Sequence, residues 1–406
     1  MLLSLQLLLV MVCWTQASDF FSTQGGYFYG TFTSFPKNTF VNGSALMTHR
    51  AMVNTRVCYN GSTLFCFNSN CDYSNFSVGT VDEESTGEWC QMETILIIPG
   101  ITYKNDDILV IAYTVGNWVE GIKNTISSWG TVVLLDQRNR SDIGKENSSP
   151  QSTIIPVVRV PSNCQRKLDL LMFDPDGDEV KCRYGKPLQL PPECNPCNPP
   201  SVLNLSTSCS LSFSPTDSSN EGAYAVQVLM EDFPRENITM TGINGTETKI
   251  TPNDILSRVP VQFVLLVDPA VPSCTEGDFL PKFLPPTPAN RAQLYTPVNK
   301  ALEISISAEA QSSTISELLF SGPYNTIQSK TGPAQFTLRW TPSERQDGES
   351  QPFCFVVQAL SKETKYHSDL RCVSVTVRNG APASASAFVL VVGSFISALI
   401  LPFPSI

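Results

Sequence analysis

Alternation of apolar and polar residues is the dominant pattern in this chain, and it predicts β-strands. In residues 302–306 Leu and Ile alternate with Glu and Ser, and the same period of two recurs at residues 336–340 and 373–377. Successive side chains of a strand point to opposite faces, so one face of each strand belongs to a core and the other to solvent. No amphipathic helix of useful length stands out. We therefore expect an all-β fold.

Shorter apolar runs predict further strands, separated by clusters of Pro, Gly, Asn and Asp. They lie at residues 27–33, 95–98, 108–113, 132–135, 157–160, 168–173, 180–184, 211–213, 223–230, 261–267 and 355–359. Asn60-Gly61, in the centre of residues 57–65, predicts a tight hairpin. Short strands joined by such turns are typical of β-sandwiches. We expect tandem Ig-like or cadherin-like sandwiches.

Breaks in this pattern predict three domains. The first is a β-rich, disulfide-containing domain at residues 18–155, and β-sandwich domains follow at residues 156–270 and 271–378. Residues 141–152 are polar and contain Gly and Pro, which predicts an exposed loop just before the first boundary.

Both ends of the chain are apolar and resemble processing signals. Residues 1–17 combine an apolar run with a small-x-small ending at Ala17, which predicts a cleaved signal peptide. Residues 379–406 begin with small residues and continue as an apolar tail with no basic residue after Arg378. This favours a glycosylphosphatidylinositol (GPI) anchor attached at Asn379, and the alternative is a single transmembrane helix. Either anchor predicts a cell-surface protein on the extracellular face of the plasma membrane.

The cysteine count agrees with an oxidising compartment. The chain has 13 cysteines, and loss of Cys13 with the signal peptide leaves an even number. We expect all of the others to form disulfides: Cys58, Cys66, Cys71, Cys90, Cys164, Cys182, Cys194, Cys197, Cys209, Cys274, Cys354 and Cys372. The first four are expected to pair among themselves. Five cysteines lie in the second domain, so Cys274 is the economical partner for one of them, and Cys354 is expected to face Cys372.

Glycosylation motifs and charge restrict the class of partner. Eight N-x-S/T motifs predict N-linked glycans, at Asn42, Asn60, Asn75, Asn139, Asn147, Asn204, Asn237 and Asn244. The net charge is −10, from 27 basic and 37 acidic residues. A chain this acidic is a poor ligand for nucleic acid. An extracellular protein or a glycan is the expected partner.

Two segments resemble known extracellular domains. GPAQFTLRWTP at residues 332–342, followed by QDG at 346–348 and FCFVV at 353–357, is similar to the G-x-F-x-W-x-P…Q-x-G…F-x-V pattern of cadherin-like and Ig-like domains. In that pattern Trp340 fills the core, Pro342 ends a strand and Gly348 turns the chain. FDPDGD at residues 173–178 resembles a turn of the same class. The resemblance covers residues 156–378, and it implies extracellular β-sandwiches without catalytic activity.

The aspartates of this turn are candidate metal ligands. Asp174, Asp176 and Asp178 alternate around it, and Ca²⁺ prefers six to eight oxygen ligands. Glu231, Asp232 and Asp268 are further acids that would complete such a site. The alternative is a tight turn whose acids are solvated. Ca²⁺ is the one cofactor that the sequence suggests.

Other chemistry has little support. Cys194-Asn-Pro-Cys197 is a C-x-x-C motif, but without a thioredoxin-like βαβ pattern around it a structural disulfide is favoured. The chain has two histidines, His49 and His367, in different expected domains, and the common hydrolase and nucleotide-binding motifs are absent. We predict no catalytic residues.

We therefore expect a non-catalytic glycoprotein of the cell surface that acts in adhesion or ligand recognition. Two alternatives remain open. One is a carbohydrate-active enzyme with a carboxylate pair beside Trp89, Trp118 or Trp129 of the N-terminal domain, where these tryptophans form a ligand platform instead of packing in the core. The other is a structural coat protein that associates with itself.

Overall fold

The structure is a computed structural model, and it describes residues 26, 29–41, 44–55, 58, 76–99, 108–113, 117–187, 193–194, 196–242 and 244–378. The expected all-β fold is confirmed for this part of the chain. Its only helical segments are two single 3-10 turns, η2 (Ser218–Asn220) and η3 (Glu344–Gln346). The predicted signal peptide, the 57–65 hairpin and the C-terminal tail lie outside the described residues, apart from Cys58.

A ten-stranded sheet forms the larger part of the molecule, and it contains strands from both sides of residue 155. Its main path runs β12-β15-β18-β1-β2-β4-β3, and β5, β6 and β9 join beside it. The strands are β1 (Tyr29–Val41), β2 (Ser44–Thr55), β3 (Phe76–Glu83), β4 (Cys90–Pro99), β5 (Ile108–Tyr113), β6 (Thr131–Asp136), β9 (Val157–Pro161), β12 (Glu179–Tyr184), β15 (Gly222–Phe233) and β18 (Ser257–Asp268).

This sheet corrects the expected division at residue 155. Strand β18 pairs with β15 along one edge, and on its other edge it pairs with β9, β1 and β6 in turn. Tyr29 of β1 therefore lies opposite Phe263 of β18. Because β18 is almost completely buried, the first and second expected domains share one sheet and one core.

The polar residues 141–152, which the sequence predicts as an exposed loop, are buried from Glu146 onward. All of residues 146–155 are buried. Their polar groups are satisfied within the protein, as where the Ser149 N–H donates to the Ser34 carbonyl at 2.7 Å and the Ser149 hydroxyl accepts from the Ser34 N–H at 2.8 Å. Hydrogen bonding of this kind is what allows a polar segment to be buried.

Three small sheets surround the large one. They pair β10 (Arg166–Asp169) and β13 (Leu203–Leu205) with β14 (Ser210–Phe213), β8 (Gln151–Ser152) with β11 (Met172–Phe173), and β7 (Asn139–Arg140) and β17 (Glu247–Ile250) with β16 (Ile238–Thr241). The predicted strand at residues 168–173 is thus split between two sheets.

Residues 282–377 form a two-sheet unit that we call the C-terminal sandwich. One sheet has the order β19-β21-β24-β23 and the other β20-β27-β25-β22, with β26 beside β25. The strands are β19 (Lys282–Leu284), β20 (Ala292–Thr296), β21 (Leu302–Glu309), β22 (Thr314–Ser321), β23 (Ile327–Gly332), β24 (Gln335–Trp340), β25 (Ser350–Ser361), β26 (Thr364–His367) and β27 (Arg371–Val377).

The core of the C-terminal sandwich matches the roles expected from its motif. Trp340 is 1% exposed and packs edge-on against Phe353 of the opposite sheet, and its indole N–H donates to Asn325. Strand β24 ends at Trp340, and Gly348 has a φ of +80°, which favours glycine. These three expectations are confirmed. The assignment to cadherin-like or Ig-like domains remains a prediction.

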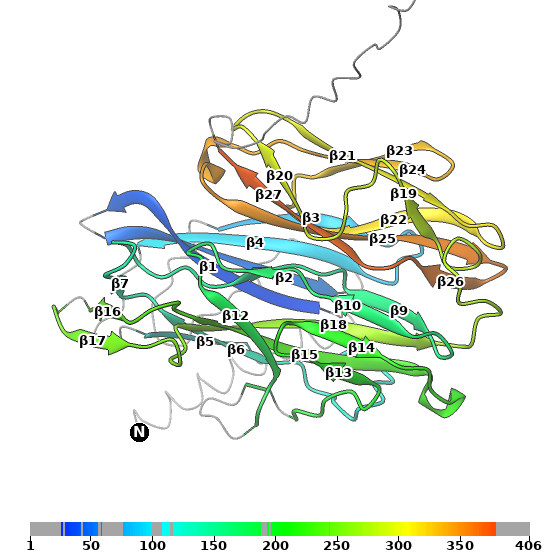
Figure 1. The fold of residues 1–406 in the computed structure, drawn as a ribbon, viewed down its shortest axis with the longest axis horizontal. Helices are drawn as coiled ribbons and strands as arrows, with labels where there is room; N and C mark the ends of the chain where they lie inside the picture. Colours follow the sequence, from blue (N-terminus) through cyan, green and yellow to red (C-terminus); the bar gives the residue numbers. More distant parts are fainter. Residues whose placement is uncertain are drawn as a thin grey trace, which may run out of the picture.

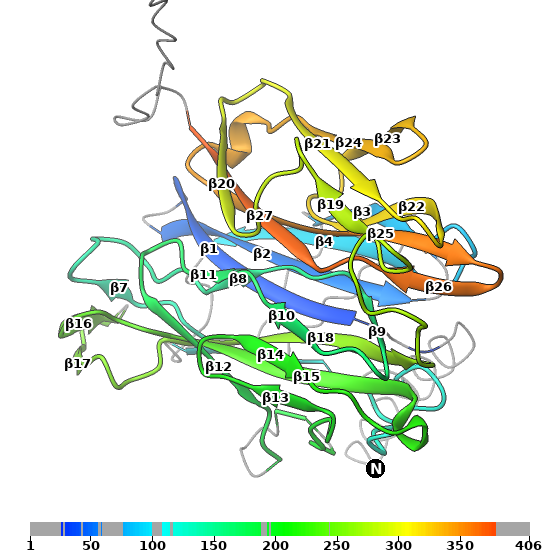
Figure 2. The same ribbon diagram turned by 45° about the vertical axis from the view of Figure 1, so that its right-hand side comes forward.

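The C-terminal sandwich packs on the β1–β4 part of the large sheet, as Figures 1 and 2 show from two directions. We call this contact the polar seam, because hydrogen bonds and ion pairs cross it repeatedly. Arg50 pairs with Glu93 at 2.6 Å on the large sheet and donates to Gln351 of the sandwich. The Gln91 amide donates to the Ser321 hydroxyl at 2.9 Å.

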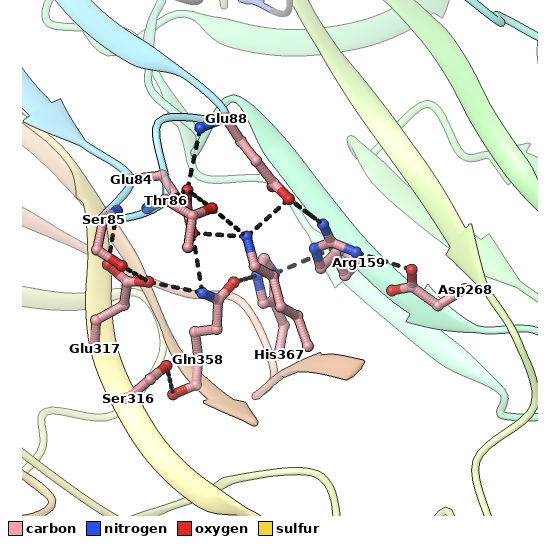
Figure 3. A network of polar contacts seen from close by, with 11 residues as sticks. Glu84, Ser85, Thr86, Glu88, Arg159, Asp268, Ser316, Glu317, Gln358 and His367 are labelled. Atoms are coloured by element: carbon pink, nitrogen blue, oxygen red, sulfur yellow. Dashed lines mark hydrogen bonds and ion pairs between the residues drawn. The ribbon is translucent and has the colours of Figure 1, made fainter. Parts of the chain in front are cut away.

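Figure 3 shows the polar seam around the β3–β4 turn. The Lys365 ammonium of β26 donates to Glu84 at 2.8 Å and pairs with Glu88 at 2.7 Å. The Gln358 amide donates to Glu84 as well, at 3.3 Å, and its oxygen faces Nε2 of His367 at 3.0 Å. The turn and the sandwich are therefore held by one connected network of polar groups, in which Glu84, Gln358 and His367 are buried.

Candidate functional site

The D-P-D-G-D turn connects β11 to β12, and its aspartates point to different partners. Asp174 Oδ1 accepts the N–H groups of Asp176 and Asp178, at 2.8 and 3.3 Å, which closes the turn. Gly177 has a φ of +88°, a value that favours glycine. Asp174 Oδ2 is buried and accepts no hydrogen bond.

The structure brings a fourth aspartate to this turn. Oxygen atoms of Asp174, Asp178 and Asp232 all lie within 4.8 Å of one another. Asp232 is at the end of β15, directly opposite Val180 of β12. It is fully buried and accepts the Ser257 N–H at 2.6 Å. We call Asp174, Asp178 and Asp232 the carboxylate cluster.

Asp176 is outside the carboxylate cluster, although the sequence predicts it as a ligand. Its Oδ2 accepts the Ser148 N–H at 2.6 Å, and its Oδ1 pairs with Lys145 at 2.9 Å. The two other acids expected near the site are also placed elsewhere. Glu231 accepts hydrogen bonds from Arg183 and Arg258, and Asp268 accepts one from Arg159 at 2.9 Å.

Arg140 and Asn147 hold the carboxylate cluster from one side. The Arg140 guanidinium is 1% exposed and donates to both oxygens of Asp178, to both oxygens of Asp142 and to Asn147 Oδ1. The Asn147 amide donates to Asp232 Oδ2 at 3.1 Å and to the Ser257 hydroxyl at 2.9 Å. Sequence reasoning missed both residues, because Asn147 is part of a glycosylation motif and no candidate site includes Arg140.

Burial and mutual repulsion make ionisation costly in the carboxylate cluster. Burial, together with the charges of Asp232, Asp176 and Asp178, raises the pKa of Asp174 well above its usual range. Burial is also the main cause that raises the pKa of Asp232, against the opposing hydrogen bonds of Asn147 and Ser257. These are the directions expected for acids that are withdrawn from water beside like charges.

The structure is incompatible with a glycan at Asn147. The side chain is buried, and its amide nitrogen already donates to Asp232, to the Ser257 hydroxyl and to the Ser148 carbonyl. The described asparagines of the other motifs, Asn139, Asn204, Asn237 and Asn244, are exposed. Asn42, Asn60 and Asn75 lie outside the described residues.

We expect Asn147 to be unmodified in the folded protein. The measurement is mass spectrometry of tryptic peptides after enzymatic deglycosylation in ¹⁸O water, which labels every asparagine that carried a glycan. The exposed asparagines are the internal comparison, because at least one of them is expected to be labelled. Quantitative labelling of Asn147 in correctly folded protein would contradict its buried position.

The three candidate tryptophans and both histidines are buried. Trp89, Trp118 and Trp129 are 1%, 2% and 4% exposed, so they form no ligand platform on the surface. His49 is buried, and burial lowers its pKa to about 4. His367 accepts the Arg159 N–H on Nδ1 at 3.4 Å, and burial lowers its pKa as well.

The cysteines form five disulfides among the described residues. They join Cys58 to Cys90, Cys164 to Cys274, Cys182 to Cys209, Cys194 to Cys197 and Cys354 to Cys372. Cys274 thus pairs with a cysteine of the second expected domain, and the C-x-x-C motif is closed on itself. Cys354 and Cys372 face one another across β25 and β27. Cys66 and Cys71 lie outside the described residues.

Comparison with known proteins gives a distant relative. The chain is 25% identical over 286 residues to an "integrin beta-like protein A" of Dictyostelium discoideum, an alignment that covers 61% of this chain and 13% of that protein. The chain therefore matches only a small part of the length of this relative. No protein-family model matches the chain. In the described part of the chain, no helix has the length and hydrophobicity needed to cross a bilayer.

Proposed function

We propose that this protein is a non-catalytic adhesion or recognition glycoprotein of the cell surface, which binds an extracellular protein or glycan. The observation that carries the proposal is the similarity to an integrin beta-like protein. The all-β architecture with five disulfides supports it, because disulfides are typical of proteins that fold outside the cytosol. The predicted tail at residues 379–406 would hold the β-sheet body at the membrane through a lipid anchor.

A cell-aggregation experiment tests this function. The full chain is expressed in non-adherent cells that carry one dye, and these cells are mixed with parental cells that carry another. We expect aggregates that contain expressing cells. A chain that stops after Arg378 is the matched control, because it keeps the described body and lacks the predicted anchor, and cells that express it are expected to stay dispersed.

The composition of the aggregates identifies the kind of partner. Aggregates of expressing cells alone indicate binding between copies of this chain, and mixed aggregates indicate a different surface ligand. Treatment with phosphatidylinositol-specific phospholipase C should disperse either kind if the tail carries a GPI anchor. Dispersed cells in every mixture, with the protein detected on the surface, would contradict an adhesive function.

A further inference from the structure

The carboxylate cluster concentrates more negative charge than its neighbours neutralise. Five aspartates meet around the turn, because Asp142 and Asp176 lie beside the three cluster residues, and they share two basic partners, Arg140 and Lys145. Asp232 and the Asp176 side chain are fully buried. Isolated charges are rarely buried without a partner, because leaving water is costly for them. Either protonation of the carboxylates or a further cation balances this charge.

One oxygen of the carboxylate cluster is directly available to a ligand. Asp174 Oδ1 is used by the turn, whereas Asp174 Oδ2 is buried and receives no hydrogen bond. A buried carboxylate oxygen without a donor is rare in folded proteins. Since the carboxylates of Asp178 and Asp232 lie within 4.8 Å of that of Asp174, an ion between them could contact all three.

We propose that Asp174, Asp178 and Asp232 bind a divalent cation, with Ca²⁺ as the preferred ion. The three residues offer carboxylate oxygens only, and hard oxygen ligands select Ca²⁺ or Mg²⁺ over zinc and copper. Three carboxylates favour Ca²⁺, because Mg²⁺ is usually bound through one or two carboxylates and keeps several waters.

Arg140 and Asn147 act as positioning residues in this site. Arg140 fixes both oxygens of Asp178, and Asn147 fixes Asp232 through an amide hydrogen bond of 3.1 Å. Arg140 is the last residue of β7, and Asn147 lies in the segment between β7 and β8, which is buried from Glu146 onward. A bound cation would thus join the β11–β12 turn to the end of β15, and the hydrogen bonds of Arg140 and Asn147 would hold its carboxylate ligands in place.

Calcium titration of the purified, EDTA-treated protein tests the site. By isothermal titration calorimetry we expect one site with a Kd of about 0.1–1 mM, the range of extracellular calcium modules. Saturating Ca²⁺ should raise the melting temperature by about 3 °C. Mg²⁺ in a parallel titration should bind at least about tenfold more weakly.

Four single variants distinguish binding at this site from nonspecific binding of Ca²⁺ to an acidic protein. Asp232→Asn and Asp174→Asn should abolish the calcium response. Asp174→Asn keeps the oxygen that closes the turn and removes a charge from a repulsive cluster, so it is expected to fold and to melt no lower than the parent protein in EDTA. Asp232→Asn turns an amide N–H towards the Asn147 amide or the Ser257 N–H, so it is expected to fold but to melt somewhat lower in EDTA. Asp176→Asn should weaken binding by less than about tenfold. Asp217→Asn, at an exposed position without a side-chain capping bond, should change nothing.

The outcomes are distinct. Loss of binding in Asp232→Asn and Asp174→Asn together with retention in Asp217→Asn supports the site. The proposal would be overturned if Ca²⁺ gave no heat of binding and no change in melting temperature with the folded parent protein. It would also be overturned if all four variants lost the same amount of calcium affinity. These measurements use pure protein in solution, so their result is independent of adhesion between cells.

Discussion

Replacing Arg140 by methionine is expected to lower the free energy of unfolding by about 3–5 kcal/mol in calcium-free buffer. Arg140 is 1% exposed and bonds to Asp178, Asp142 and Asn147. Methionine has a similar length but no charge, so the substitution leaves the buried carboxylate of Asp178 without its basic partner. Removing one member of a buried ion pair is costly, because the other member stays buried and unpaired.

Urea denaturation followed by tryptophan fluorescence measures this loss. Arg339→Met is the matched control, because Arg339 and its partner Glu303 are 58% and 61% exposed at 3.9 Å, and exposed pairs contribute less than about 1 kcal/mol. Added Ca²⁺ should restore part of the stability of Arg140→Met and leave Arg339→Met nearly unchanged. A loss below about 1 kcal/mol for Arg140→Met would contradict the role assigned to this residue.

Lys365→Met is expected to cost about 3 kcal/mol and to loosen the C-terminal sandwich from the large sheet. Lys365 bridges Glu84 and Glu88 across the polar seam, and Glu84 is 1% exposed. Without Lys365 the Glu84 carboxylate keeps hydrogen bonds from Thr86 and Gln358 but loses its cation. Hydrogen exchange of the β3–β4 turn and of β26 should quicken together.

A double-mutant cycle and a matched control separate the loss of the Glu84–Lys365 interaction from an unrelated loss of stability. Glu84→Gln combined with Lys365→Met should cost less than the sum of the two single changes, because no unpaired charge is left buried. Lys167→Met removes an ion pair in which the lysine is 63% exposed, and should cost less than about 0.5 kcal/mol. Purely additive losses would show that Glu84 and Lys365 do not act as a pair.

The Glu84–Lys365 pair also makes the stability of the polar seam depend on pH in the acid range. Burial acts to raise the pKa of Glu84, but hydrogen bonds from Lys365, Thr86 and the backbone outweigh it and lower the pKa from 4.5 to about 2. A lowered pKa means that the carboxylate stabilises the folded protein above pH 4.5, and that this contribution is lost as the pH falls from 4.5 towards 2. The Lys365→Met protein should lose less stability over this range.

The sequence predicts strands best where one face of the sheet is polar. Strands β21, β24 and β27 follow the alternating pattern closely, and the apolar runs at 223–230 and 261–267 lie within β15 and β18. Strand β2 was missed. Its residues 47–54 are all buried, because the sheet is covered on both faces there, so polar and apolar positions do not alternate.

Contacts between segments that lie far apart in the sequence could not be predicted from it. The pairing of Tyr29 with Phe263 joins two expected domains, and no local pattern indicates it. Asp232 joins the D-P-D-G-D turn only because the register of β12 and β15 places it opposite Val180. The glycosylation motif at Asn147 is a local signal, whereas the burial of Asn147 depends on the tertiary structure.

Binding of the whole protein to cells tests its proposed adhesive function most directly. The chain is released from expressing cells, labelled with a fluorophore and added over a range of concentrations to cells that do not express it, with flow cytometry as the readout. Adhesion through a specific surface ligand, or between copies of the chain on expressing cells, predicts saturable binding that unlabelled protein competes away. Binding that stays linear with concentration on both kinds of cell, or that never exceeds the background of an unrelated glycoprotein, would contradict it.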